Sequence, residues 1–435
     1  MKRPIRPKYY PSQAFVSTIS ILIFLASVFP AINLTGCSWM ATPLNTIQNG
    51  ERVSPYVNPG AKNWVYLQDE IDQAEDGAVI DLTDYLYPMP SSSIMCKQVT
   101  VSVPSDLSIT LRGKPDWSYD CLSFVFAGDN HIRLENVALM NTPFGYGEPP
   151  ISILHFGGGD NFLELVGANS ALYCAPKEWM GAVDTGILPD AYLGYGAAIG
   201  VPEGVKLTVS GSGSLSAKGD GGAAGIGGGF GVSSGTIRID SGNITAHSGS
   251  MSPIMGGAAI GGGSGAAGGL TIISDGSVIA YGYNGTAGIG GGYGADAGEI
   301  VISGGYVEAH TDGGGAAIGG SRGGSGGRIS IEGGEVVAFS AIDEYEPTNS
   351  YPGPAIGNGY NGTGGTLNVS GGTLTAYSSG KPNHTAIDCA IQSLPVRYNW
   401  RAGNLDDESS SLVHVYPDSS FANSSEYSFV MIETY

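Results

Sequence analysis

Basic residues are scarce in this sequence. Lys and Arg number 19 among 435 residues, against 39 Asp and Glu, so the formal net charge is −20. Proteins that bind nucleic acid neutralise phosphates with a basic surface, and we therefore expect no nucleic-acid partner. Cysteine is rare as well, with 5 residues. No spacing among them is typical of a zinc site, and we expect neither a metal nor a cofactor.

Two further classes are excluded by composition. The 71 glycines do not fall on every third position, which excludes a collagen helix. The hydrophobic content of 42% is enough to bury a large core, which argues against general disorder. The chain is therefore expected to be an acidic β protein rich in Gly and Tyr, long enough for one to three domains.

The N-terminus has the features of an export signal. Residues 2–8 carry four basic side chains and no acidic one, and an apolar run follows from Ala14 to Ile32. This order is typical of a secretory signal peptide. The sequence Leu34-Thr35-Gly36-Cys37 then resembles the lipobox of bacterial lipoproteins. That resemblance implies cleavage after residue 36, lipid on Cys37 and anchoring at the cell surface.

Plain secretion and an uncleaved membrane anchor are the alternatives, because the apolar run is close to the shortest that spans a bilayer. Removal of residues 1–36 would take away four basic residues and leave 15 against 39 acidic ones, a charge of −24. In an oxidising compartment the remaining cysteines are able to pair. Cys96 and Cys121, 25 residues apart, are a possible disulfide, and four unpaired thiols are the alternative.

A repeat dominates the second half of the chain. Its core is a pair of small residues followed by Ile and, in six of seven copies, Gly. The core isoleucines are Ile199, Ile226, Ile260, Ile289, Ile318, Ile356 and Ile387, spaced by 27, 34, 29, 29, 38 and 31 residues. A fixed motif at a drifting interval of this size is typical of a solenoid with loops of variable length.

Two short segments with apolar residues at alternate positions follow each core, as expected for strands with one face inward. The first predicts inward pairs at Leu207/Val209, Ile237/Ile239, Leu270/Ile272, Ile300/Ile302, Ile329/Ile331 and Leu367/Val369. The second ends on a small residue, at Ala217, Ala246, Ala280, Ala309, Ala338 and Ala376. Three short strands per repeat predict an all-β fold, a parallel β-helix with seven Gly-rich coils over residues 196–390.

The preceding segment, residues 63–195, shows alternating strands without the Gly motif. Before them, Leu67, Ile71 and Ala74 share one helical face and Gly77 follows as a stop signal, which predicts a short helix that caps the solenoid. Residues 37–62 are expected to be a linker, and residues 391–435, with a final apolar strand at 429–432, a C-terminal cap.

Residues 128–137 and the strands around them resemble the N-terminal coils of the pectate-lyase-like right-handed β-helix superfamily. The Gly-rich repeats are similar to the arrays of Ala-Gly-Ile-Gly-Gly-Gly type in cell-surface proteins of gut Firmicutes. The two resemblances cover most of residues 63–390. They imply a right-handed β-helix, but no single activity, because the superfamily includes lyases, hydrolases, epimerases, adhesins and carbohydrate binders.

Two columns of the repeat are candidates for a binding surface. Four residues after each core Ile stand Glu203, Phe230, Ser264, Tyr293, Arg322 and Tyr360. Directly after each terminal Ala stand Lys218, His247, Tyr281, His310, Phe339 and Tyr377. Equivalent residues on adjacent coils lie about 4.8 Å apart, so each column forms a row, and the second faces outward if the Ala faces inward. Exposed rings over a glycine floor suit sugar rings.

Carbohydrate binding by these side chains is the primary hypothesis, with a polysaccharide or glycan as the partner. Stacking for structural reasons alone is the alternative, and would make the protein an adhesin or stalk. A polysaccharide-degrading enzyme is a third hypothesis, but a glycosidase needs two carboxylates at a set separation. The acidic residues of the repeats, Glu308 among them, are scattered over different columns, and no catalytic pair is singled out.

Overall fold

The computed structural model describes residues 46–48, 51–53, 62–63, 65–86, 99–120, 122–141, 152–173, 196–252, 255–341, 353–378, 385–395, 397–403 and 427–434. The chain divides into two compact units, Met1–Pro55 and Tyr56–Tyr435. Of the first unit, the described part is an antiparallel pair of strands, β1 (Thr46–Gln48) and β2 (Glu51–Val53). The signal peptide and Cys37 lie outside the described residues.

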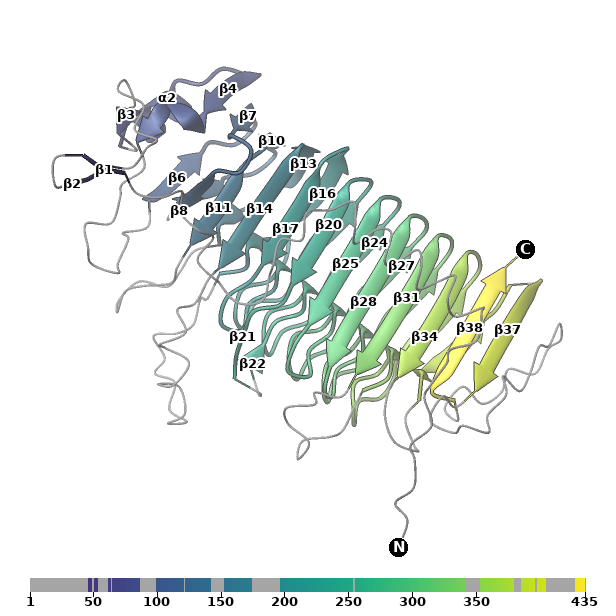
Figure 1. The fold of residues 1–435 in the computed structure, drawn as a ribbon. Coiled ribbons are helices and arrows are strands. Elements are labelled where there is room, and N and C mark those ends of the chain that lie inside the picture. The colour runs from purple at the N-terminus through teal and green to yellow at the C-terminus, as the bar shows by residue number, and fades with distance from the viewer. Residues whose placement is uncertain are drawn as a thin grey trace, which may run out of the picture. The chain divides into compact units, whose positions relative to one another are not determined.

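The second unit is built from three long sheets, and successive turns of the chain add one strand to each (Figure 1). Within a Gly-rich repeat the chain passes first through a two-residue strand containing the core Ile. We call the sheet of these strands sheet 1. Its ten strands are β6 (Val99–Val103), β9 (Leu122–Phe126), β12 (Leu154–Phe156), β15 (Ile199–Gly200), β18 (Ile226–Gly227), β23 (Ile260–Gly261), β26 (Ile289–Gly290), β29 (Ile318–Gly319), β32 (Ile356–Gly357) and β35 (Ile387–Asp388).

Sheet 2 contains the second strand of each coil and is parallel throughout. Its eleven strands are β4 (Ala78–Asp81), β7 (Ser108–Arg112), β10 (His131–Glu135), β13 (Asp160–Val166), β16 (Lys206–Gly211), β19 (Thr236–Ile239), β24 (Leu270–Ile273), β27 (Glu299–Ile302), β30 (Arg328–Ile331), β33 (Thr366–Val369) and β36 (Ala390–Ser393).

Sheet 3 contains the third strand of each coil and lies in front in Figure 1. Its parallel strands are β8 (Ser118–Asp120), β11 (Ala138–Asn141), β14 (Ala168–Tyr173), β17 (Ser214–Lys218), β20 (Asn243–His247), β25 (Ser277–Gly282), β28 (Tyr306–Asp312), β31 (Glu335–Ala341) and β34 (Thr373–Ser378). The sheet ends with two antiparallel strands, β38 (Phe429–Thr434) and then β37 (Tyr398–Gly403). The predicted final strand is therefore present, and it reverses the strand direction. The whole arrangement is a right-handed parallel β-helix.

The predicted helix is α2 (Val65–Asp72), with Leu67 and Ile71 fully buried. Strand β6 is the edge strand of sheet 1. The side-chain amide of Gln68 donates to the Ser102 carbonyl oxygen (2.9 Å) and accepts from the Ser102 N–H (2.8 Å). Gln68 thus makes on β6 the pair of hydrogen bonds that a further strand would make, and protects an otherwise open edge.

Two minor pairings complete the described elements. Strands β3 (Lys62–Asn63) and β5 (Tyr85–Leu86) pair in parallel beside a 3₁₀ turn, η1 (Leu82–Asp84). Strands β21 (Ser250–Ser252) and β22 (Met255–Gly256) form a small antiparallel ribbon in a loop after sheet 3.

The inside of the β-helix is a stack of like side chains. All seven core isoleucines are fully buried, and each pairs in register with the next along sheet 1. In five of the seven repeats the core Ile is followed by a Gly with positive φ, a position that does not accommodate a side chain. At Gly290, for example, φ is +139°, and a β-carbon would lie 2.0 Å from the carbonyl oxygen of Gly319 on the next coil.

One predicted strand face is wrong. Leu270 and Ile272 face outward, whereas Thr271 and Ile273 are buried. In the second to sixth Gly-rich coils, the first inward residue of sheet 2 lies 11 residues after the core Ile, at Ile237, Thr271, Ile300, Ile329 and Leu367. The length of the turn sets the register, because a one-residue slip moves every side chain to the other face. The four consecutive residues Leu-Thr-Ile-Ile do not reveal that register by alternation.

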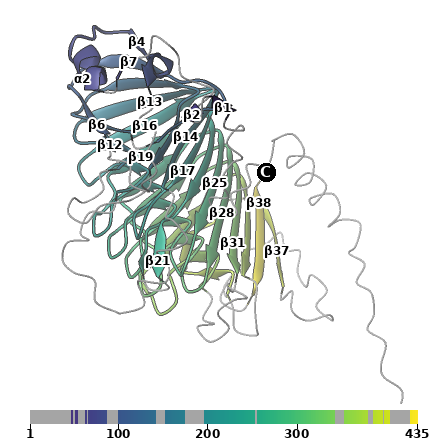
Figure 2. The ribbon, with the colours of Figure 1, turned by 60° about the vertical axis from the view of Figure 1, so that its left-hand side comes forward.

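Variation in coil length is confined to one corner. In the same coils the terminal Ala always lies 20 residues after the core Ile. The distance from a terminal Ala to the next core Ile varies instead. Counted from Ala217 on, it is 9, 14, 9, 9, 18 and 11 residues. The variable loops therefore all follow the carboxyl ends of sheet 3, where β21 lies in Figure 2. Such loops are a common place for function on a rigid scaffold.

The register of β24 is tested by two adjacent isoleucines. Ile273→Ala removes a fully buried side chain, and we expect a loss of about 2–5 kcal/mol in the free energy of unfolding. Ile272→Ala changes a half-buried outward residue and is expected to cost less than about 1 kcal/mol. Chemical denaturation of both variants measures the difference, and equal losses would contradict the register.

Candidate functional site

The second predicted column forms a continuous ladder on sheet 3. We call its five rings, His247, Tyr281, His310, Phe339 and Tyr377, the ring ladder. Neighbouring rings are nearly parallel from His247 to Phe339, with centroids 4.8, 4.8 and 5.2 Å apart and planes within 18°. Tyr377 ends the stack edge-on to Phe339, at 5.6 Å and 72°. The spacing is that of the strands themselves.

Stacking determines which parts of these rings a ligand reaches. The neighbouring alanines are fully buried, so the rings lie on the outer surface, as strand alternation requires. The faces of Tyr281 and His310, however, are covered on both sides by other members of the ladder. A sugar that packs its C–H face on an aromatic ring would have to displace this stacking, whereas the ring edges stay outward. The geometry favours a structural role for the ladder.

A buried carboxylate supports the middle of the ladder. Tyr306, Glu308 and His310 alternate along the outer face of β28, and Glu308 is only 8% exposed. Its carboxylate accepts hydrogen bonds from the Tyr306 hydroxyl and from Nε2 of His310, the latter at 2.6 Å. The bond from His310, more than any other contact, lowers the pKa of Glu308 in spite of its burial. In the sequence Glu308 is one of several scattered acidic residues, and the Tyr-x-Glu-x-His alternation of residues 306–310 is the signal that distinguishes it.

This carboxylate is poorly suited to glycoside hydrolysis. That reaction uses a second carboxyl group facing the first across the substrate. The hydrogen-bonding partners of Glu308 are instead a phenol and an imidazole, which hold it ionised and orient His310. The network therefore stabilises the ladder by holding His310 in place along β28.

The first ring of the ladder, His247, is buried and contacts a tyrosine of the next coil. His247 Nδ1 is 3.0 Å from the hydroxyl oxygen of Tyr283, which reaches back from the next coil. Burial lowers the pKa of His247 to about 4. Asp220, 6% exposed, precedes it by one coil, and burial raises its pKa to about 7. Within the described part of the chain, Asp220 Oδ2 and His247 Nε2 have no hydrogen-bond partner.

The first predicted column has a different geometry. We call Phe230, Ser264, Tyr293, Arg322 and Tyr360 the loop row, because each lies in the loop after sheet 1; Glu203, which precedes them, is exposed. The N–H groups of the last four donate to the carbonyl oxygens of Gly222, Gly256, Gly285 and Gly314 on the preceding coil, at 2.7–3.2 Å. Each of these glycines lies four residues before a core Ile. The same backbone hydrogen bond therefore recurs in each repeat and fixes the position of the row.

Among the described residues, aromatic stacking does not continue along the loop row as it does along the ladder. A β-carbon at Gly222 would lie 2.7 Å from Cδ2 of Phe230, so this ring occupies the space that the glycine leaves. Ser264, which is buried, stands on the coil between Phe230 and Tyr293. Among the described residues, neither of these two half-buried rings stacks on another aromatic ring. The guanidinium carbon of Arg322 lies 5.8 Å from the centre of the Tyr360 ring.

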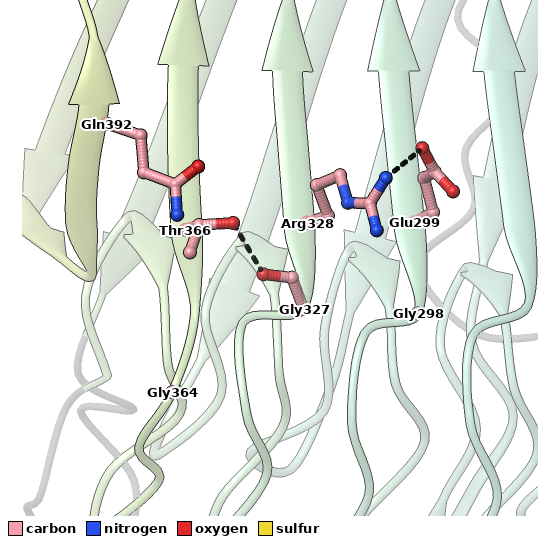
Figure 3. Close-up of a pocket in the computed structure, with 7 residues that line it drawn as sticks. All are labelled: Gly298, Glu299, Gly327, Arg328, Gly364, Thr366 and Gln392. Carbon is pink, nitrogen blue, oxygen red and sulfur yellow. Dashed lines mark hydrogen bonds and ion pairs between the residues drawn. The ribbon is translucent and has the colours of Figure 1, made fainter.

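A shallow groove of about 730 Å³ lies on the outer face of sheet 2, at the beginning of β27, β30 and β33 (Figure 3). Its lining is Gly298, Glu299, Gly327, Arg328, Gly364, Thr366 and Gln392. Arg328 points toward Glu299, and Nη1 lies 3.6 Å from a carboxylate oxygen. Thr366 donates weakly to the carbonyl oxygen of Gly327, at 3.4 Å. These exposed groups satisfy each other, and such pairs contribute little energy.

Several further predictions concern metal ions, membranes and cysteines. Within the described ranges, no three His, Cys, Asp or Glu residues are grouped so that they could hold a metal ion. No helix there is both long and apolar enough to cross a bilayer. Cys389 is a free, half-buried thiol. Cys96 and Cys121 lie outside the described residues, so their pairing stays a prediction.

The fold places this protein among the parallel β-helices, and comparison with protein families agrees. A model of the beta helix repeat family matches residues 237–264, 272–293 and 300–324. These segments include Ser264, Tyr293 and Arg322 of the loop row. They also include His247, Tyr281 and His310 of the ring ladder. No curated protein and no solved structure matches the chain.

Burial of Asp220 and burial of His247 predict opposing effects of pH on the stability of the fold. Asp220 binds its proton more tightly in the folded state, so its contribution to stability is lost as the pH rises from about 4 to 7. His247 binds its proton less tightly when folded, so its contribution is gained as the pH rises from about 4 to 6.5. The two effects oppose each other in the wild-type protein.

Asp220→Asn removes one of these effects. We expect the stability of the variant relative to wild type to rise between pH 4 and 7, with a slope approaching about 1.4 kcal/mol per pH unit. Urea denaturation at a series of pH values measures this slope. Asp275→Asn makes the same replacement at an exposed turn residue and is the matched control. A flat difference for Asp220→Asn would contradict the assignment.

Proposed function

We propose that this protein binds a carbohydrate chain along the loop row. The observation that carries the proposal is the separation of Phe230 from Tyr293 by the small, buried Ser264. No other described ring stacks on them, so a ligand could pack on them without displacing aromatic stacking. The C–H face of a sugar ring packs on such a surface while its hydroxyl groups hydrogen-bond to polar neighbours.

The dimensions of the row suit an extended ligand. Its five members stand on five successive coils, so the row extends over four steps of about 4.8 Å, or about 19 Å. At least one glycine is adjacent in sequence to each member, and glycine allows a ligand to approach the backbone closely. A linear glycan of several sugar residues would therefore contact more than one member at once.

Both predicted columns were candidates for this role, and the geometry favours the loop row. The rings of the ladder already use their faces on one another. The same stacking is the observation that favours the second candidate function, a stalk or adhesin in which the rings only stabilise the coils. The Glu308 network, with one carboxylate held by two donors, gives less support to an enzyme.

The proposal includes the place of action. Export through the signal at residues 1–36 and lipid on Cys37 would hold the β-helix at the cell surface, where glycans are accessible. The acidic character of the chain, −20 overall, would keep it soluble there. No membrane contact other than the lipid anchor is proposed.

Glycan binding is tested by incubating the purified protein with plant, mucin and bacterial glycans and measuring its depletion from solution. For a glycan that depletes it, we expect Phe230→Ala and Tyr293→Ala each to weaken binding roughly tenfold, since each removes an aromatic contact of about 1.4 kcal/mol. Phe162→Ala and Tyr66→Ala remove exposed rings outside the row and are the matched controls.

Three outcomes would overturn the proposal. Unchanged affinity in both loop-row variants would exclude the row as the binding surface. Absence of binding to every glycan would favour the stalk. New oligosaccharides in the supernatant, detected by mass spectrometry, would show an enzyme. Circular dichroism of each variant confirms that a loss of binding is not a loss of fold.

A further inference from the structure

Arg322 differs from the other arginines of the Gly-rich coils in its surroundings. Arg238 Nε lies 2.7 Å from a carboxylate oxygen of Asp240, and Arg328 Nη1 lies 3.6 Å from one of Glu299. In the part of the chain that the structure describes, Arg322 has no carboxylate within 4.0 Å.

The side chain of Arg322 is nevertheless held in place by its neighbours. A β-carbon at Gly314 would lie 3.1 Å from Cγ of Arg322, so the side-chain stem packs on this glycine. The guanidinium group lies over the Tyr360 ring at 5.8 Å, within the range of a cation–π interaction. The Arg322 N–H donates to the Gly285 carbonyl oxygen at 3.2 Å. The side chain is half-buried and is supported on both sides.

A guanidinium group held in this way is prepared to bind an anion. Its planar set of donors matches a carboxylate or a sulfate with two parallel hydrogen bonds. Partial burial makes such a bond stronger than it is in open water. Because Gly314 and Tyr360 already restrict the side chain, little conformational entropy is lost when a ligand binds.

We infer that the loop row recognises an acidic glycan, whose carboxylate or sulfate group binds to Arg322 while an adjoining sugar ring packs on Tyr293 one coil away. The inference rests on the proposed function and adds the chemical class of the ligand. The overall charge of −20 repels long polyanions. The ligand class is therefore a glycan with an isolated acidic sugar rather than a uniformly charged polymer.

Matched oligosaccharides test the inference. Each pair differs only in its charged group: a sialylated oligosaccharide against its desialylated form, and a sulfated one against its desulfated form. Isothermal titration calorimetry measures the ratio of the two dissociation constants within each pair. We expect wild type to bind the charged member at least tenfold more tightly in one pair, which also decides between carboxylate and sulfate.

Three substitutions locate the preference. Arg322→Gln should reduce the ratio to near one, and Arg322→Lys should restore only part of it, because an ammonium group lacks the paired donors of a guanidinium. Arg328→Gln lies on the same coil and removes the same charge, but in the groove of sheet 2, and should keep the wild-type ratio. Thermal unfolding of all three establishes that they are folded.

The outcomes separate this inference from the proposed function. Equal affinity of wild type for charged and neutral members, with both lost in Tyr293→Ala, would overturn the inference and leave carbohydrate binding in place. A preference that persists in Arg322→Gln, or that disappears in Arg328→Gln, would also overturn it. Failure of wild type to bind any member of either pair or any glycan of the wider panel would reject both.

Discussion

Parallel pairing of each strand with its equivalent on the next coil is the constraint on which this structure depends. It places like residues directly above one another, so the core isoleucines form a continuous buried stack. It also brings the backbones so close at Gly227, Gly261 and Gly290 that no side chain fits there. On the outer face the same pairing stacks the rings of the ladder at the strand spacing. Core, backbone and surface therefore repeat with one period.

Because that pairing is strict, variation is confined to the loops after sheet 3. From core Ile to terminal Ala the later coils do not differ in length, whereas the return to the next core Ile does. The two outer rows differ in the same way, because one lies on strands and the other on loops. The ring ladder lies on regular strands and is closed by self-stacking, with Glu308 as its buried support. The loop row lies on irregular backbone, and among the described residues its rings do not form a continuous stack; it is the proposed binding surface.

Much of this was predictable from the sequence. Recurrence of the core motif and period-two alternation predicted three sheets and the inward faces of most strands, because stacked coils must repeat their buried residues. The capping helix was predicted from the helical spacing of Leu67, Ile71 and Ala74. Prediction was wrong at residues 270–273, where four consecutive residues with apolar character or branching hide the alternation. The first inward residue lies 11 residues after the core Ile in the neighbouring coils, and this distance indicates Thr271 as the inward residue here. The pairing of His310 with Glu308 was hidden because both lie on one strand at a spacing that many solvated residues share.

The sequence by itself determined which residues repeat, and hence the solenoid, its buried isoleucines and the two outer rows. Only the tertiary structure decided what the rows present to solvent. Whether rings on adjacent coils stack on each other or stand apart depends on side-chain rotamers and on the path of the loop backbone, and neither is encoded in a periodic pattern. The same holds for Arg322, because packing on Gly314 and Tyr360, and the lack of a carboxylate within reach, are properties of three dimensions.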